Sequence, residues 1–141
     1  MTEQSERILT YVDACLLIAA FQNRSERDRR AVEVLGDKRR IFVASDALWL
    51  EVMPKALFNK RPDEADFYAD FFGRAQQRLS WNTATLQRAH TLASTYGLAA
   101  MDAIHIAFAL EAGADQFISA ENSGKRMFAV QEMPVLTIAL K

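Results

Sequence analysis

The chain has 141 residues, of which 50% are hydrophobic and 25% are charged. This length and balance predict a single globular domain over residues 1–141, with a core large enough to be stable without cross-links. The 17 Lys and Arg residues nearly match the 18 Asp and Glu residues, so the total charge does not indicate a strongly basic nucleic-acid-binding protein. What matters is therefore where the charges lie.

The sequence contains no segment that would carry the chain into or across a membrane. Its first seven residues lack the basic and then apolar order of a signal peptide, and charges interrupt every apolar run before it could span a bilayer. Cys15 is the only cysteine and lies among apolar residues, so it is expected to be a buried thiol in a reducing compartment. These features predict a soluble, cytoplasmic protein with no membrane partner.

Apolar runs and amphipathic segments follow one another in an order that predicts strands alternating with helices. In chain order, the predicted elements are a strand at 8–12, helices at 14–21 and 25–36, a strand at 41–43, a helix at 45–57, a helical stretch within 63–79, a strand at 79–81, helices at 83–97 and 101–112, and strands at 116–119 and 135–138. Pro54 should kink the helix that Ser45 caps, or mark a joint in it. The order predicts a three-layer α/β/α domain with a mostly parallel central sheet.

Three carboxylates lie in apolar stretches without a Lys or Arg beside them: Asp13, Glu51 and Asp102. A buried carboxylate without a partner is costly, so such residues usually cap a helix, pair with a base or bind a cation. Asp13 or Asp102 taken alone could be a helix cap. Glu51 falls in the middle of a predicted helix, where a cap has no place. The three acids together therefore favour a shared site.

The predicted topology brings a fourth acid to this site. In an open parallel sheet, ligands bind beyond the carboxyl ends of the strands. Asp13 follows the first strand and Glu121 follows the strand at 116–119, whereas Asp115 precedes that strand and should be a structural residue at the opposite edge. Clustered carboxylates cannot all stay ionised unless a cation neutralises them, and hard oxygen ligands select Mg²⁺ or Mn²⁺.

Other chemistries have no motif in the chain. There is no GxxxxGK[ST] loop and no GxGxxG sequence, so nucleotide binding of those kinds is not supported. A haloacid-dehalogenase-like phosphatase would need Asp-x-Asp, and position 15 is Cys. His90 is expected on a helix surface. His105, one turn after Asp102, is expected to be a packed or orienting residue rather than a metal ligand.

Four segments, taken in order, resemble the PIN domain and specifically the short bacterial VapC-type toxins. They are the strand ending in Tyr-Val-Asp13, the helix that carries Glu51 after Val-Ala-Ser, the run Met-Asp102-Ala-Ile-His-Ile-Ala, and the run Gly-Ala-Asp-Gln-Phe-Ile-Ser119-Ala-Glu121. The resemblance covers nearly the whole chain. It implies a compact nuclease in which four acids hold one or two divalent ions and RNA is hydrolysed by a metal-activated water.

The resemblance also implies a role for each matching residue. Asp13, Glu51 and Asp102 match the family's metal ligands. Glu121 stands where the family usually has Asp, and Ser119 stands where a Ser or Thr commonly helps to orient the site. The implied catalytic set is thus these five residues, and the implied cofactor is Mg²⁺ or Mn²⁺.

The resemblance implies three partners: an RNA substrate, an antitoxin and a second copy of the chain in a homodimer. Lys125 and Arg126 lie just beyond Glu121 and are the preferred phosphate contacts. The antitoxin would fill a groove between amphipathic helices near residues 32–35 and 57–58. The other basic candidates for RNA contact are Arg24, Arg27, Arg29, Arg30 and residues 38–40.

Two further functions remain open from the sequence. The chain could be a catalytically weak or inactive module that binds RNA or protein, because Ala14 replaces a frequent hydroxyl residue and Glu121 replaces Asp. It could also be a PIN nuclease that acts in RNA maturation or on DNA without an antitoxin. Metal-dependent cleavage separates the first of these from a toxin, and a neighbouring antitoxin gene separates the second.

Overall fold

The structure is a computed structural model that describes residues 7–139. It contains one sheet of five strands in the order β3-β2-β1-β4-β5, and every neighbouring pair is parallel. The predicted parallel sheet is therefore confirmed. The strands are β1 (Ile8–Val12), β2 (Arg40–Ser45), β3 (Gln77–Leu79), β4 (Gln116–Ser119) and β5 (Val135–Thr137).

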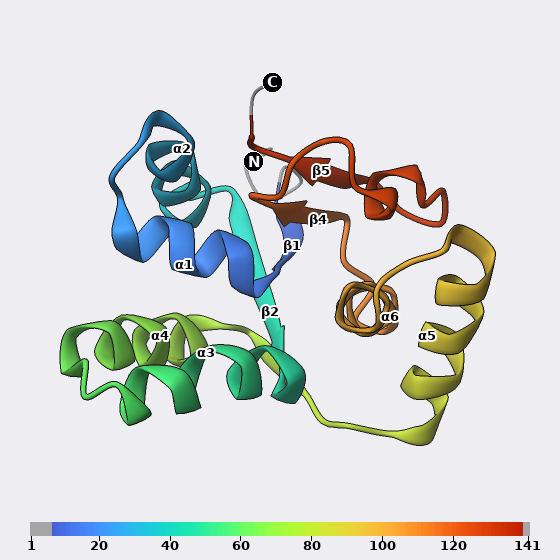
Figure 1. Cartoon of the computed structure of the whole chain (residues 1–141), viewed down its shortest axis with the longest axis horizontal. Coiled ribbons are helices and arrows are strands. Elements are labelled where there is room, and N and C mark those ends of the chain that lie inside the picture. Colours follow the sequence, from blue (N-terminus) through green and yellow to red (C-terminus); the bar gives the residue numbers. More distant parts are fainter. Residues whose placement is uncertain (1–6, 140–141) are drawn as a thin grey trace.

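Helices cover both faces of this sheet, as Figure 1 shows, which confirms the predicted three-layer α/β/α arrangement. The helices α1 to α4 lie on one face, and α5 and α6 lie on the other. Their bounds are α1 (Ala14–Gln22), α2 (Glu26–Leu35), α3 (Asp46–Phe58), α4 (Pro62–Arg74), α5 (Thr83–Tyr96) and α6 (Ala100–Glu111), and a short 3₁₀ helix, η2 (Arg126–Ala129), follows β4.

Two cores result, because neighbouring residues of a strand face opposite sides of the sheet. In β1, Tyr11 packs into the core beneath α5 and α6, and Val12 packs into the core beneath α1 to α4. Phe117 and Ile118 in β4 divide in the same way. Each face of the sheet therefore has its own core.

The structure corrects two predictions near the edge strand. The strand expected at 79–81 lies at Gln77–Leu79, and the helix expected within 63–79 ends at Arg74. The backbone of Ala75 is already extended, and the N–H of Gln76 donates to the carbonyl of Phe42 at 2.8 Å. Pairing with β2 therefore begins earlier than the apolar pattern suggests, and it leaves residues 80–82 as a connection.

The predicted helix starts are borne out by side-chain caps. Ser25 and Ser45 each accept a hydrogen bond from a backbone N–H three residues further on, at the starts of α2 and α3. Helix α3 continues through Pro54 without interruption, so the expected joint is absent. Within residues 7–139, no helix has both the length and the apolar character that crossing a membrane requires.

Candidate active site

The parallel sheet brings two of the predicted acids to one edge. Asp13 follows β1 directly, and Glu121 lies two residues beyond the end of β4. Val12 pairs with Ile118 in parallel register, so the ends of these two strands are level. The placement of Asp13 and Glu121 at the carboxyl edge is confirmed.

Asp115 lies at the opposite edge, immediately before β4. Its Oδ2 accepts a hydrogen bond from the backbone N–H of Leu9 at 2.9 Å, and its own N–H donates to the carbonyl of Leu9 at 2.7 Å. These two bonds tie the start of β4 to β1. The structural position predicted for Asp115 is therefore confirmed.

Glu51 and Asp102 come from opposite layers. Glu51 lies in the middle of α3, and Asp102 lies in the first turn of α6. The N-cap residue of α6 is Ala99, so the alternative in which Asp102 caps its helix is wrong. Asp13 does cap α1, because its Oδ1 accepts a hydrogen bond from the N–H of Leu16 at 3.1 Å.

The carboxyl group of Asp13 is the most buried of the four. Burial raises its pKa from 3.8 to about 6, against the effect of hydrogen bonds from the Ser119 hydroxyl and the Leu16 amide. The charge of Asp102 raises the pKa of Asp13 further. No Lys or Arg side chain of residues 7–139 forms an ion pair with Asp13, so within that part of the chain this buried acid has no direct counter-ion.

The charges of other acids also affect the pKa of Asp102. Its pKa is raised, first by burial and then by the negative charges of Glu121 and Glu51, while the nearby Lys125 lowers it. The Nζ of Lys125 lies 3.8 Å from Oδ2 of Asp102 and 3.8 Å from Oε1 of Glu121. Asp102 is therefore affected by the charges of Glu121, Glu51 and Lys125, and the Lys125 ammonium group lies near Asp102 and Glu121.

The chemistry of this donor set fits a hard divalent cation, because carboxylate oxygens are the ligands that Mg²⁺ and Mn²⁺ prefer. In residues 7–139, no three His, Cys, Asp or Glu side chains are arranged to hold an ion as they stand. The side chains of Glu51 and Glu121 are each 35% exposed, which leaves them room to change rotamer. Sharing one ion would need such a movement, so the convergence of the acids on a cation stays a prediction.

A buried chain of hydrogen bonds holds Glu51. Oε1 of Glu51 lies 2.6 Å from Nε2 of His105, and Nδ1 of His105 lies 2.7 Å from the Tyr11 hydroxyl. That hydroxyl lies 2.7 Å from Oγ of Ser45, which in turn accepts the N–H of Leu48 at 3.1 Å. Both His105 and Tyr11 are almost fully buried.

The donor and the acceptor of each hydrogen bond in this chain follow from the groups at the two ends of the chain. A carboxylate only accepts, so Nε2 of His105 must carry the hydrogen that reaches Glu51. In the neutral ring, Nδ1 then accepts from Tyr11, and the Tyr11 oxygen accepts from Ser45. Burial raises the pKa of the Tyr11 phenol, which keeps it protonated as a donor. His105 therefore lies where it can orient Glu51, in line with the packed or orienting position expected for it. Tyr11 also belongs to this hydrogen-bonded chain, although the sequence does not single it out.

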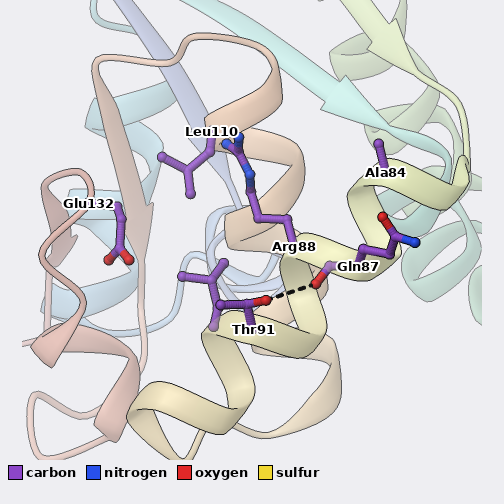
Figure 2. A pocket seen from close by; sticks show the side chains of 7 residues that line it. Ala84, Gln87, Arg88, Thr91, Leu110 and Glu132 are labelled. Carbon is purple, nitrogen blue, oxygen red and sulfur yellow. Dashed lines mark hydrogen bonds between the residues drawn. The ribbon is translucent and has the colours of Figure 1, made fainter.

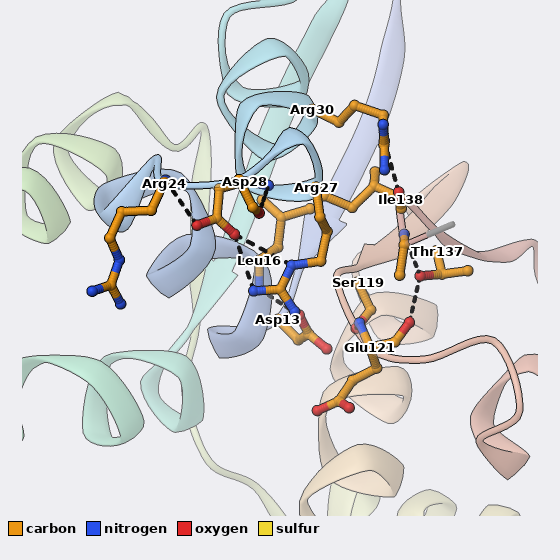
Figure 3. Close-up of polar contacts among 12 residues, drawn as sticks. Asp13, Leu16, Arg24, Arg27, Asp28, Arg30, Ser119, Glu121, Thr137 and Ile138 are labelled. Atoms are coloured by element: carbon orange, nitrogen blue, oxygen red, sulfur yellow. Dashed lines mark hydrogen bonds and ion pairs between the residues drawn. The ribbon is translucent and has the colours of Figure 1, made fainter. Parts of the chain in front are cut away.

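Ser119 is fully buried at the end of β4 and braces the turn that follows. Its Oγ accepts the N–H of Glu121 at 3.0 Å, and the carbonyl of Glu121 accepts the hydroxyl of Thr137 at 2.5 Å. Figure 3 shows these contacts beside Asp13. The backbone that carries the fourth acid is thus fixed, whereas its side chain extends outward.

The basic candidates divide between the two edges of the sheet. Lys125 lies at the acids, and the Arg126 side chain lies against Gly97, the residue that ends α5. Arg27 is paired with Asp28 at 3.0 Å, as Figure 3 shows, and is 41% exposed. Residues 38–40 lie at the start of β2 and are therefore at the opposite edge.

Cys15 is only partly buried, which corrects the expectation of a buried thiol. It packs against the core beneath α1 to α4. Burial raises the pKa of its thiol to about 12, and the charges of Asp13 and Glu121 contribute to this rise. The thiol is therefore protonated at neutral pH and is a neighbour of the acids without being an anionic ligand.

A cavity of about 630 Å³ lies elsewhere, against α5, α6 and the segment near Glu132. Figure 2 shows that helix side chains line it, among them Gln87, Arg88 and Thr91. None of the four acids belongs to its lining. It therefore offers no alternative to the edge of the sheet as a site for hydrolysis.

Known proteins of this fold include several VapC chains. The chain superposes on VapBC2 from Rickettsia felis, bound to a DNA fragment from its promoter, with a TM-score of 0.68 at 10% identity, covering 92% of this chain and 98% of that one. A toxin–antitoxin complex from Klebsiella pneumoniae gives 0.66 at 20% identity, with 94% and 99% covered. The sarcin–ricin-loop-cleaving toxin VapC20 from Mycobacterium tuberculosis gives 0.64 at 15% identity, with 89% and 99% covered. At these identities the likeness shows a shared fold.

A search among curated proteins finds no significant match to the chain. The sequence model of the PIN domain, however, matches residues 10–127. The match includes Asp13, Glu51, Asp102 and Glu121 and spans most of the chain. The chain therefore belongs to the PIN domain family.

Proposed function

We propose that this chain is a divalent-metal-dependent endoribonuclease and the toxin of a type II toxin–antitoxin pair. The observation that carries the proposal is the buried Asp13 carboxyl at the carboxyl edge of the sheet, whose pKa rises to about 6 and which feels the negative charge of Asp102, itself affected by Glu121 and Glu51. Like charges held close together destabilise the folded state unless a cation neutralises them. Membership of the PIN family supports a nuclease.

In this proposal Asp13, Glu51 and Asp102 hold Mg²⁺ or Mn²⁺, and Glu121 stands at the rim of the site. Such an ion, when bound, supplies a water of lowered pKa and stabilises negative charge on the phosphodiester. The chain's own groups prepare the site. Ser119 fixes the backbone of Glu121, and Lys125 and Arg126 would contact phosphates of the substrate.

The VapC neighbours support the choice of partners. The likeness to VapC20, a toxin that cleaves the sarcin–ricin loop, favours structured RNA as the substrate class. The likeness to toxin–antitoxin complexes favours an antitoxin, which would cover apolar side chains on α3. Among these, Leu57 is 62% exposed and Phe58 is 85% exposed. A homodimer is part of the same proposal.

Cleavage of RNA by the purified chain tests the proposal. We expect products from a structured RNA with Mg²⁺ or Mn²⁺, none with a chelator, and recovery when the ion is added back. Addition of the cognate antitoxin should stop cleavage. A chain that binds RNA without cutting it at any ion concentration would instead be the inactive module. Metal-dependent cleavage by a chain whose gene has no neighbouring antitoxin gene would instead indicate a nuclease of RNA maturation.

Limiting Mg²⁺ should reveal which acid flanking β4 belongs to the site. We expect Glu121→Gln to lower the cleavage rate, because it removes a negative charge beside Asp102. Glu121→Asp should retain or improve the rate. Asp115→Asn is the matched control at the other edge and should leave the rate nearly unchanged. Rates measured across an Mg²⁺ titration give the comparison, and a greater loss from Asp115→Asn than from Glu121→Gln would overturn the assignment.

A further inference from the structure

Lys125 occupies an unusual place for a surface lysine. Its Nζ lies 3.8 Å from a carboxylate oxygen of Asp102 and 3.8 Å from one of Glu121. Within residues 7–139, it is the only Lys or Arg that forms an ion pair with any of the four acids. One ammonium group therefore serves two members of the site.

The backbone holds Lys125 in this place. Residues 122–125 form a tight turn in which the N–H of Lys125 donates to the carbonyl of Asn122 at 3.1 Å, and the N–H of Gly124 donates to Oδ1 of Asn122 at 2.9 Å. On the far side, Met127 is buried to 1% exposure. The turn is thus anchored before and after the lysine, which aims its side chain back over Glu121.

Fold stability does not account for this arrangement. The Lys125 side chain is 41% exposed, and its partners Glu121 and Asp102 are 35% and 20% exposed. Ion pairs with this degree of exposure contribute little to stability. The positive charge matters more to the site, where it stands between two carboxylates that would otherwise attract a cation.

We propose that Lys125 takes the place of a second divalent ion, so that the site loads a single ion. This inference rests on the proposed metal-dependent function. Asp13, Glu51 and Asp102 would hold that ion, and Lys125 would neutralise Glu121 and the second oxygen of Asp102. The ammonium would also supply positive charge near a phosphate of the substrate.

The charge of Lys125 disfavours a second ion between Asp102 and Glu121. Its ammonium lies 3.8 Å from an oxygen of each carboxylate, and at that range its positive charge repels a divalent ion. The second position becomes available only when the ammonium is removed.

Counting bound Mn²⁺ tests this inference without any measurement of activity. Isothermal titration and the loss of the free Mn²⁺ electron-paramagnetic-resonance signal each give the number of ions per chain. We expect one ion in the parent protein and two in Lys125→Met, which keeps the length of the side chain and removes its charge. Lys38→Met is the matched control at the opposite edge and should bind one ion.

A second substitution locates the added ion. Glu121→Gln introduced into Lys125→Met should return the count from two ions to one, because the new position needs the carboxylate of Glu121. Lys125→Arg should bind one ion, since it keeps the positive charge. Equal melting temperatures of the metal-free variants would show that the fold is retained.

Each remaining outcome decides the question. Two ions in the parent, or one ion in Lys125→Met, would overturn the proposed role of Lys125. One ion in Lys125→Met together with weaker RNA binding would show that the lysine only contacts a phosphate. A parent that binds no Mn²⁺ and cleaves no RNA would reject the proposed function itself. The two failures are therefore distinguishable.

Discussion

Asp13→Asn is expected to reduce RNA cleavage by at least about 100-fold, since loss of even an outer partner of a metal ligand can cost that much. The same change should make the metal-free protein more stable. Asn is as good a helix cap as Asp, so the bond from the N–H of Leu16, now 3.1 Å from Oδ1, can be kept. The buried negative charge is removed, and with it the repulsion from Asp102.

The gain in stability depends on pH with a defined sign. The pKa of Asp13 is raised from 3.8 to about 6 in the folded protein, a difference that corresponds to about 3 kcal/mol. Below about pH 4 the carboxyl is protonated in both the folded and the unfolded chain, so the variant gains nothing. The advantage of Asn grows between about pH 4 and pH 6 and is complete above that range.

Urea unfolding in the presence of a chelator, at pH 4 and at pH 7, measures this effect. Asp28→Asn is the matched control, because Asp28 is also buried but its pKa is lowered by hydrogen bonds from the Arg24 amide and the Arg27 guanidinium. That control should lose about 1 to 3 kcal/mol at pH 7, and its loss should shrink in acid. A destabilised Asp13→Asn at pH 7 would show that the parent carboxyl is not strained by burial.

Tyr11→Phe is expected to weaken Mn²⁺ binding by about 10- to 100-fold, although the tyrosine lies inside the core and is not a ligand. The change removes one oxygen, which leaves Nδ1 of His105 without its donor and the Ser45 hydroxyl without its acceptor. The imidazole can then change tautomer or turn. Glu51 loses the fixed hydrogen bond that orients its carboxylate.

Mn²⁺ titration of single and double variants separates this effect from general loosening of the fold. In a Glu51→Gln background, Tyr11→Phe should change Mn²⁺ affinity little, because the ligand it positions has already been lost. Tyr96→Phe is the control, since its hydroxyl donates to Glu132 at 2.7 Å and lies outside the hydrogen-bonded chain that holds Glu51. Equal losses of affinity from Tyr11→Phe in both backgrounds would contradict a positioning role.

The sequence predicted most of the fold because each strand and helix carries its own apolar pattern and caps. It also placed Asp13 and Glu121 together, since parallel strands present their carboxyl ends at one edge. The same reasoning assigns Asp115 and Glu121 to opposite edges of the sheet. The edge strand was misplaced because it has three residues, and its register depends on a bond from Gln76 to β2.

The hydrogen-bonded chain behind Glu51 could not have been predicted in this way. Tyr11 bonds to Ser45 and His105, which lie 34 and 94 residues away along the chain, and no local pattern encodes such contacts. One feature of the sequence does point to Tyr11, because a tyrosine near the end of a buried strand needs a hydrogen-bond partner for its hydroxyl. The sequence likewise predicts that Lys125 lies close to Glu121, but only the folded structure shows that it also lies beside Asp102.

The two cores arise from different halves of the chain, and this division has a consequence during translation. The core beneath α1 to α4 is drawn largely from residues 12–75, whereas most of the other comes from residues 79–135. Domains form from the amino-terminal end as the chain emerges, so the first half appears with Asp13 and Glu51 alone. The remaining acids, Asp102 and Glu121, arrive near the end of synthesis. If the chain is the proposed ribonuclease, its four acids are all present only after its last strands have emerged from the ribosome.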